Sequence, residues 1–211
     1  MLQKEEFVRR ISWIIGLVIV SSFIASAQSA PRADIFGGYT YNRVSDFTIP
    51  FESLFNMQGP AFPVPAYGLN GYTGSVNVRA YRWLGVTAEI TDLYGTPLKT
   101  IVSTPVNARE HEYSYLAGPR VSVSFRHERW TPFVQALYGE AHGTALVTVP
   151  GETGSFYLSE RKYTVATGGG LDLALRKHLA ARLVQAEYAV THFEGSQQKN
   201  LRISTGLVFR F

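Results

Sequence analysis

The carboxyl-terminal stretch from Leu201 to Phe211 alternates between two kinds of side chain, and this pattern constrains the fold more than any other feature. One face carries mainly apolar and aromatic residues: Leu201, Ile203, Thr205, Leu207, Phe209 and Phe211. The other face carries mainly polar or small residues: Arg202, Ser204, Gly206, Val208 and Arg210. A period of two predicts a β-strand with one oily side. That side would face a core in a soluble protein and lipid in a transmembrane barrel.

The same alternation recurs along the chain and predicts eight strands. The runs are residues 33–42, 70–81, 84–93, 111–125, 130–141, 163–175, 179–193 and 201–211. Short connections at 82–83, 126–129 and 176–178 alternate with longer links at 43–69, 94–110, 142–161 and 194–199. Eight strands that run up and down place all short turns at one end, which is the asymmetry of outer-membrane barrels.

The distribution of charge separates a membrane barrel from a soluble one. Seven charged residues fall opposite the apolar face of their runs, together with Gly and Ser: Asp34, Arg79, Glu89, Arg120, Asp172, Glu187 and Arg202. A soluble lipocalin-like barrel has its polar face outside, where many Lys and Glu are expected. The pattern favours a polar lumen and a lipid-facing exterior, so we predict an all-β, eight-stranded, antiparallel up-and-down transmembrane β-barrel.

The amino terminus indicates export. Lys4, Arg9 and Arg10 precede an apolar run, and Ala25-Ser26-Ala27 forms a small-residue cleavage pattern. We therefore predict a signal peptide at residues 1–27 and a barrel domain at 28–211, with cleavage after Ala30 as a second option and a retained membrane anchor as the alternative. The chain has no cysteine, and its net charge of +4 is too small to predict nucleic-acid binding.

Several segments together resemble a known family, the OmpA-type outer-membrane β-barrel domain. They are Asp34-Ile35-Phe36-Gly37-Gly38-Tyr39, Leu116-Ala117-Gly118-Pro119-Arg120, Pro132-Phe133-Val134-Gln135-Ala136-Leu137-Tyr138-Gly139, Gly168-Gly169-Gly170-Leu171-Asp172 and the stretch from Arg202 to Phe211. The resemblance implies an eight-stranded barrel in a bacterial outer membrane, inserted by the barrel-assembly machinery. Phe209 and Phe211 would then be part of the assembly signal. Because the resemblance ends at Phe211, we do not expect the periplasmic peptidoglycan-binding domain that full-length OmpA carries.

Charged residues predicted to face the lumen form the main candidate site. Arg79, Glu89, Arg120, Asp172 and Glu187 come from different strands and must pair in a narrow interior, because an unpaired buried charge is strongly disfavoured. A structural salt-bridge plug is the first interpretation of this network. A small ion or solute channel, whose pairs open and re-form, is the alternative.

Other residues are predicted to contact lipid or a ligand. Trp83 and Trp130 lie at short turns and are expected to anchor the barrel among outer-membrane lipids. The link from Arg43 to Leu69 contains several apolar side chains among prolines and could fold over the mouth as a lid or contact an extracellular ligand.

We expect neither catalysis nor a cofactor. The histidines form no H-x-x-x-H metal motif, and the glycines at 168–170 lie within a predicted strand rather than before a helix. A lipid-modifying hydrolase or a protease remains the third functional hypothesis. Its candidates are Ser159 and Glu160 with His142, near the third long link.

Overall fold

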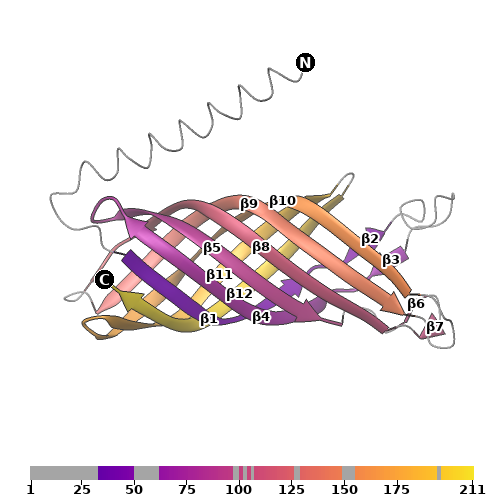
Figure 1. Cartoon of the computed structure of the whole chain (residues 1–211). Helices are drawn as coiled ribbons and strands as arrows, with labels where there is room; N and C mark the ends of the chain where they lie inside the picture. The colour runs from indigo at the N-terminus through magenta and orange to yellow at the C-terminus, as the bar shows by residue number, and fades with distance from the viewer. Residues whose placement is uncertain are drawn as a thin grey trace, which may run out of the picture.

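Eight long strands close into one antiparallel barrel in the computed structural model (Figure 1). The structure describes residues 33–49, 62–96, 100–101, 104–105, 107–125, 129–148, 155–193 and 196–211. The barrel strands are β1 (Ala33–Val44), β4 (Tyr67–Arg79), β5 (Leu84–Gly95), β8 (Asn107–Ser122), β9 (Trp130–Thr148), β10 (Ser155–Arg176), β11 (Leu179–Phe193) and β12 (Ser196–Arg210). Each pairs with its neighbours in sequence, and β1 pairs with β12 to close the sheet. The predicted fold is confirmed.

Alternation of side chains determines which face of each strand is inside. In β4 and β5, buried and exposed residues alternate almost without interruption. β12 follows the predicted phase, with Arg202, Ser204 and Val208 buried and Leu201, Ile203 and Phe209 exposed. Closure leaves no free sheet edge. The backbone N–H and C=O groups of each strand can therefore pair with a neighbouring strand, and they need no water on the outside of the barrel.

The two ends of the barrel differ in their connections. Short turns and the ends of β1 and β12 lie together at the left of Figure 1, where Phe211 N donates to Ala33 O at 2.9 Å. Two small hairpins lie at the opposite end, formed by β2 (Phe47–Ile49) with β3 (Phe62–Val64) and by β6 (Thr100–Ile101) with β7 (Thr104–Pro105). This agrees with the predicted separation of short turns from long loops.

Several predicted boundaries were wrong because strands continue beyond the alternating runs. The stretch 142–161, expected to be a loop, is largely strand, since β9 and β10 remain paired as far as Thr148 and Ser155. The link 43–69 contains the β2–β3 hairpin and the start of β4. β8 runs from Asn107 to Ser122 rather than over 111–125, while Phe125 forms an isolated bridge with Trp130. Backbone pairing requires no apolar face, so these extensions carry little signal in the sequence.

The described residues include no helix with the length and apolar character needed to cross a membrane. The predicted signal peptide falls on residues outside those described and stays a prediction.

Apolar side chains fill the lumen at three levels between the polar groups. Near the short turns, Phe36, Ala180 and Val208 form one cluster, and a second consists of Leu116, Leu137, Ala166 and Ala189. A third cluster, made by Val44, Leu69 and Leu93 with Tyr67 against it, lies towards the long-loop end. Val44, Leu69 and Leu93 are fully buried, so the lumen is packed with side chains at this level.

Candidate functional site

The outer surface is uncharged along the central part of the barrel. We follow the outward side chains of the described strands from the short turns towards the long loops. The first charged ones along these strands are Arg43, Asp92, Arg109, Glu140, Arg161 and Lys199. Between these charged positions and the short turns, the exposed residues include Ile35, Val76, Ile90, Val134 and Leu207. A belt of this kind matches the lipid-facing surface of a transmembrane barrel.

Exposed aromatic residues border this belt on both sides. Near the short turns they are Tyr81, Trp83, Phe125, Phe209 and Phe211, and in the half nearer the long loops they are Tyr39, Tyr41, Tyr72, Tyr94, Tyr115, Tyr138, Tyr163 and Tyr188. Trp83 is exposed, whereas Trp130 at the start of β9 is half-buried, and their role as anchors stays a prediction. Two girdles of aromatic rings are typical of barrels that span a bilayer.

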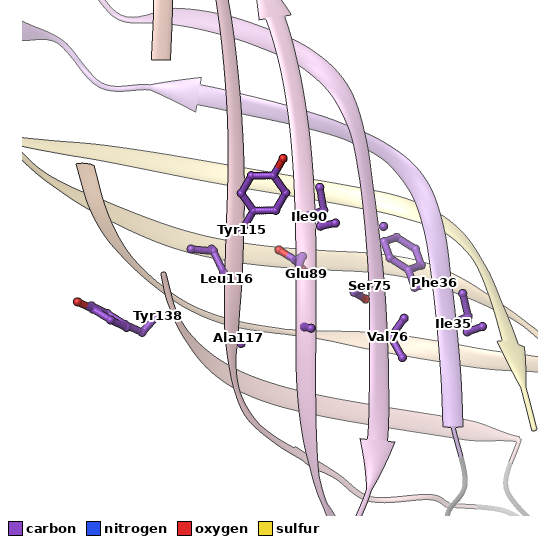
Figure 2. A pocket seen from close by; sticks show the side chains of 12 residues that line it. Ile35, Phe36, Ser75, Val76, Glu89, Ile90, Tyr115, Leu116, Ala117 and Tyr138 are labelled. Carbon is purple, nitrogen blue, oxygen red and sulfur yellow. The ribbon is translucent and has the colours of Figure 1, made fainter. Parts of the chain in front are cut away.

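A shallow groove of about 540 Å³ lies on the outer face (Figure 2). Gly74, Ala88 and Ala117 form its floor, where small side chains lower the surface between the larger Val76 and Tyr115. Glu89, Phe36 and Leu116 belong to the neighbouring inward positions and are buried. These inward residues also contribute to the lining, and the exposed part of the groove is formed by apolar residues of the belt.

Four arginines and two aspartates form the charged cluster nearest the short turns. Asp172 accepts hydrogen bonds from Arg182 Nε at 2.8 Å and Arg120 Nη2 at 3.2 Å, and Arg210 Nη2 lies 3.9 Å away. Arg79 Nη2 donates to Asp34 Oδ1 at 2.9 Å. We call these six residues the turn-end cluster.

Two phenylalanine rings support the arginines of this cluster. Arg120 Cζ lies 3.5 Å from the ring centre of Phe133, and Arg182 Cζ lies 4.1 Å from that of Phe36. Glycines make room for both rings: a Cβ on Gly170 would lie 2.6 Å from Phe133 Cζ, and one on Gly38 would lie 2.7 Å from Phe36 Cζ. Stacking of a guanidinium on an aromatic face is favourable and persists in a packed interior.

Arg182 is the central residue that the sequence prediction missed. Strict alternation along β11 assigns it to the outer face with Val184. The pairing of β11 with β12 is irregular between Arg182 and Gln185, so Leu183 and Val184 are both exposed. This bulge returns Arg182 to the lumen, where it is 1% exposed. The one sequence signal of this change in the inward–outward alternation was two adjacent apolar residues in the run, Leu183 and Val184.

Two carboxylates and two amides occupy the middle of the lumen. Gln135 Nε2 donates to Glu187 Oε1 at 2.7 Å, and Gln185 Nε2 donates to Glu89 Oε2 at 2.9 Å. Gln185 in turn accepts a hydrogen bond from Arg182 Nη1 at 2.5 Å, which connects this group to the turn-end cluster. The uncharged amide groups of the two glutamines thus donate hydrogen bonds to the carboxylates of Glu89 and Glu187.

A third group lies towards the long-loop end. Arg202 donates to Glu112 Oε1 at 3.0 Å and to Ser114 Oγ at 3.2 Å. Glu110 lies further out, paired with Gly95 beyond the outward Asp92 and therefore outside the uncharged belt. Burial raises the pKa of the Glu110 carboxyl to about 7, even though a hydrogen bond with Tyr67 lowers that pKa. Burial also raises the pKa of the Tyr67 phenol above its ordinary value.

The five predicted lumen residues are located inside the barrel but do not form one network of direct contacts. Arg120 pairs with Asp172, whereas Arg79 pairs with Asp34. Glu89 and Glu187 are bridged through glutamines rather than by arginine. Asp34 and Arg202 were placed on the lumen face by their alternation, but their partners depend on strand register across the barrel.

The proposed hydrolytic residues meet in part. Ser159 Oγ lies 3.1 Å from His142 Nε2 on the exposed surface beyond the apolar belt. Within the described residues His142 Nδ1 is buried and has no hydrogen-bond partner. The side chain of Glu160 lies outside the described residues. A nucleophile and base are therefore adjacent, without an identified group to orient the imidazole.

The part of the chain that the structure describes contains no cluster of three or more His, Asp or Glu residues able to hold a metal ion. Searches against family models and curated proteins match nothing.

Solved structures share the architecture at low sequence identity. Ail, the attachment invasion locus protein of Yersinia pestis, has a TM-score of 0.55 and 17% identity, with 87% of this chain and 100% of Ail covered. Neisserial surface protein A gives 0.53 and 12%, covering 85% of this chain and 97% of that protein. OprG from Pseudomonas aeruginosa also gives 0.53 and 12%, covering 86% and 96%. The chain therefore has the eight-stranded barrel fold of outer-membrane proteins, which confirms the fold implied by the OmpA-type resemblance.

Proposed function

We propose that this protein is a bacterial outer-membrane β-barrel with a structural or surface-interaction role. The observation that carries the proposal is the uncharged outer belt between two aromatic girdles, with the buried charges on the opposite face of the same strands. Lipid favours this distribution, whereas water would favour its reverse. The short turns would lie in the periplasm and the long-loop end outside the cell.

The filled lumen supports a structural role over a channel. Arg182 and Arg202 are each 1% exposed, and the Val44, Leu69 and Leu93 cluster occupies the long-loop half. A narrow eight-stranded barrel is normally filled by its own side chains. The channel alternative would require the pairs with Asp172 and Glu112 to break and re-form, and planar-bilayer recordings would then show stepwise conductance. We expect no sustained porin-sized conductance.

Membrane insertion and assembly are part of the proposal. Phe209 is exposed on the lipid-facing side of β12, and Phe211 follows directly after that strand. We assign them to the signal read by the barrel-assembly machinery, and assign Trp83 and Trp130 to contacts with outer-membrane lipids at the short-turn boundary.

The surface-interaction role would involve the long-loop end. Ail has been solved in complex with the heparin analogue sucrose octasulfate, at a TM-score of 0.55 and 18% identity to this chain. In this protein the segment from Arg43 to Leu69 includes the β2–β3 hairpin, while residues 50–61 lie outside those described. Replacing residues 46–65 with a short Gly-Ser linker tests this segment: unchanged binding to cells and to sulfated polysaccharide would exclude it as the contact site.

A hydrolytic role is the second candidate, favoured by the Ser159–His142 contact alone. We propose that the protein is not an enzyme, because a Ser-His pair needs an orienting group and an oxyanion site to act efficiently. Assays of phospholipid, lipid A and peptide hydrolysis with purified protein test this. Activity lost in both Ser159→Ala and His142→Ala would establish the hydrolase instead.

Cell fractionation combined with electrophoresis of boiled and unboiled samples tests the main proposal. We expect the protein in the outer-membrane fraction, with mobility that changes on heating because the folded barrel resists detergent. A soluble periplasmic product whose migration is independent of heat would overturn the membrane assignment.

A further inference from the structure

The turn-end cluster contains more positive than negative charge. Among the residues that the structure describes, the Asp and Glu side chains that pair with Arg79, Arg120, Arg182 and Arg210 are Asp34 and Asp172 alone. Asp172, which is 1% exposed, is shared by three of these arginines. The Phe36 and Phe133 rings stabilise two guanidinium groups but do not neutralise them. Two positive charges therefore remain without a carboxylate in this cluster.

The remaining lumen carboxylates do not supply the missing partners. Glu112 binds Arg202 at the long-loop end, and Glu89 and Glu187 receive hydrogen bonds from Gln185 and Gln135. The lumen is thus polarised, with excess positive charge towards the short turns and excess negative charge further along the barrel. A buried charge excess is costly unless another ion approaches it.

The charge excess opens onto a pocket at the short-turn mouth. A cavity of about 460 Å³ is lined by five cationic side chains: Arg79, Arg129, Arg176, Lys177 and Arg210. Its described lining contains no Asp or Glu side chain, and its one anionic group is the terminal carboxylate of Phe211. Arg129, Arg176 and Lys177 are exposed at its rim. Arg79 and Arg210 reach both the cluster and the cavity, and each has a buried Nε without a hydrogen-bond partner in the described structure.

We propose that this pocket binds a phosphate-bearing anion, with Arg79 and Arg210 at its floor and Arg129, Arg176 and Lys177 at its rim. Guanidinium groups match phosphate oxygens with paired donors, and a phosphate dianion would offset part of the positive charge that the cluster and the rim cations share. The phosphate could come from a phospholipid headgroup or from a soluble phosphate compound. The site depends on the barrel fold and its charges, so it can be present whether or not the proposed surface role is correct.

Binding of phosphate is measured on the full chain folded in an uncharged sugar-based detergent, because phosphocholine detergents would compete. Isothermal titration calorimetry with pyrophosphate and inorganic phosphate should show one site that weakens as KCl is added. The variant Arg176→Gln/Lys177→Gln changes only exposed rim residues and should bind roughly tenfold more weakly, since two charge-assisted contacts are lost. Arg79→Gln/Arg210→Gln should bind more weakly still.

A matched control changes two exposed cations at the other end of the barrel. Arg43→Gln/Lys199→Gln has the same net charge as the rim variant and should bind phosphate as the wild type does. Equal affinity in the wild type and the rim variant, or equal weakening in the control, would overturn the proposal. If the floor variant does not fold, the comparison of rim and control variants still decides it.

A second arm identifies the source of the phosphate. Native mass spectrometry of the same detergent-solubilised protein, with phosphatidylglycerol added, should show a bound lipid that is lost in the rim variant and displaced by pyrophosphate. That result assigns the site to a lipid headgroup, whereas pyrophosphate binding without lipid binding assigns it to a soluble compound. Absence of both pyrophosphate and lipid binding in wild type refutes the site, independently of the fractionation result that tests the proposed function.

Discussion

Arg182 Nε donates to Asp172 Oδ1 at 2.8 Å, between two residues that are also register partners on β11 and β10. The pair exists because the β11 bulge turns Arg182 into the lumen, where Asp172 is already shared with Arg120 and Arg210. The cluster therefore has one aspartate at the centre of three arginines. Replacing the aspartate and replacing one arginine should change the free energy of unfolding by different amounts.

Loss of the central aspartate should be more damaging than loss of one arginine. Asp172→Asn leaves buried guanidinium groups without their shared carboxylate and should lower the free energy of unfolding by about 3–5 kcal/mol. Arg182→Gln reduces the positive excess while removing hydrogen bonds, so we expect a smaller loss of about 1–2 kcal/mol. Denaturant unfolding in lipid vesicles measures both values.

An exposed arginine provides the control for that comparison. Arg161 lies 3.7 Å from Glu140 with 70% of its side chain exposed, and Arg161→Gln should change stability by less than about 0.5 kcal/mol. A larger loss for Arg182→Gln than for Asp172→Asn would contradict the charge imbalance.

A charge introduced on the outer belt should destabilise the barrel according to its depth. Val134 is 61% exposed on the lipid-facing side, and Val134→Arg should cost about 2–4 kcal/mol in a bilayer. Leu146 is also outward on β9 but lies beyond Glu140, so Leu146→Arg should cost only about 0–1 kcal/mol. Equilibrium unfolding in vesicles tests this prediction. Equal losses of unfolding free energy at the two positions would show that the bilayer does not cover the belt around Val134 as we assign it.

Protonation of Glu110 should stabilise the folded protein at low pH. Its pKa rises from 4.5 to about 7 on folding, so the folded state binds a proton more tightly than the unfolded chain. This contribution is fully present below about pH 4.5 and is lost as pH rises through about 7. Relative to Glu110→Gln, the wild type should lose about 2 kcal/mol between these limits, allowing for partial solvent exposure.

Two neighbours of Glu110 should move the midpoint in opposite directions. Tyr67→Phe removes a hydrogen bond that lowers the pKa of Glu110 and should raise the midpoint, whereas Glu112→Gln removes repulsion and should lower it. Carboxyl-carbon NMR of the protein across this pH range follows the titration directly. A midpoint insensitive to both changes would show that Glu110 titrates independently of this cluster.

Phe211→Ala should impair assembly more than stability. Phe211 is 70% exposed as a whole residue, and its backbone hydrogen bond to Ala33 O does not require the ring. We expect less protein in the outer membrane after pulse labelling, but an unfolding midpoint close to that of the wild type for the purified barrel. Val123→Ala, another outward apolar change near the short turns, is the control; normal outer-membrane levels of Phe211→Ala would contradict the assembly role.

The sequence predicted the parts of this molecule that depend on a single strand. Alternation in β12 identified Leu201, Ile203 and Phe209 as outward and Arg202 and Ser204 as inward, since successive side chains of a strand point to opposite faces. It failed where that rule is interrupted, at Arg182, and where strands continue beyond the alternating runs, as in β9 and β10 beyond His142. In those extensions both faces can be polar, so no pattern marks them.

Strand number, direction and the lipid-facing side were thus determined by the order of residues, because these follow from local periodicity and from alternating short and long connections. The tertiary structure alone decided which charges meet. Contacts such as Arg202 with Glu112, and Gln135 with Glu187, join strands that are distant in sequence. Their geometry depends on barrel closure, register and a single bulge. If the strand register or the bulge shifts by one residue, the same side chain points to the opposite face of the sheet.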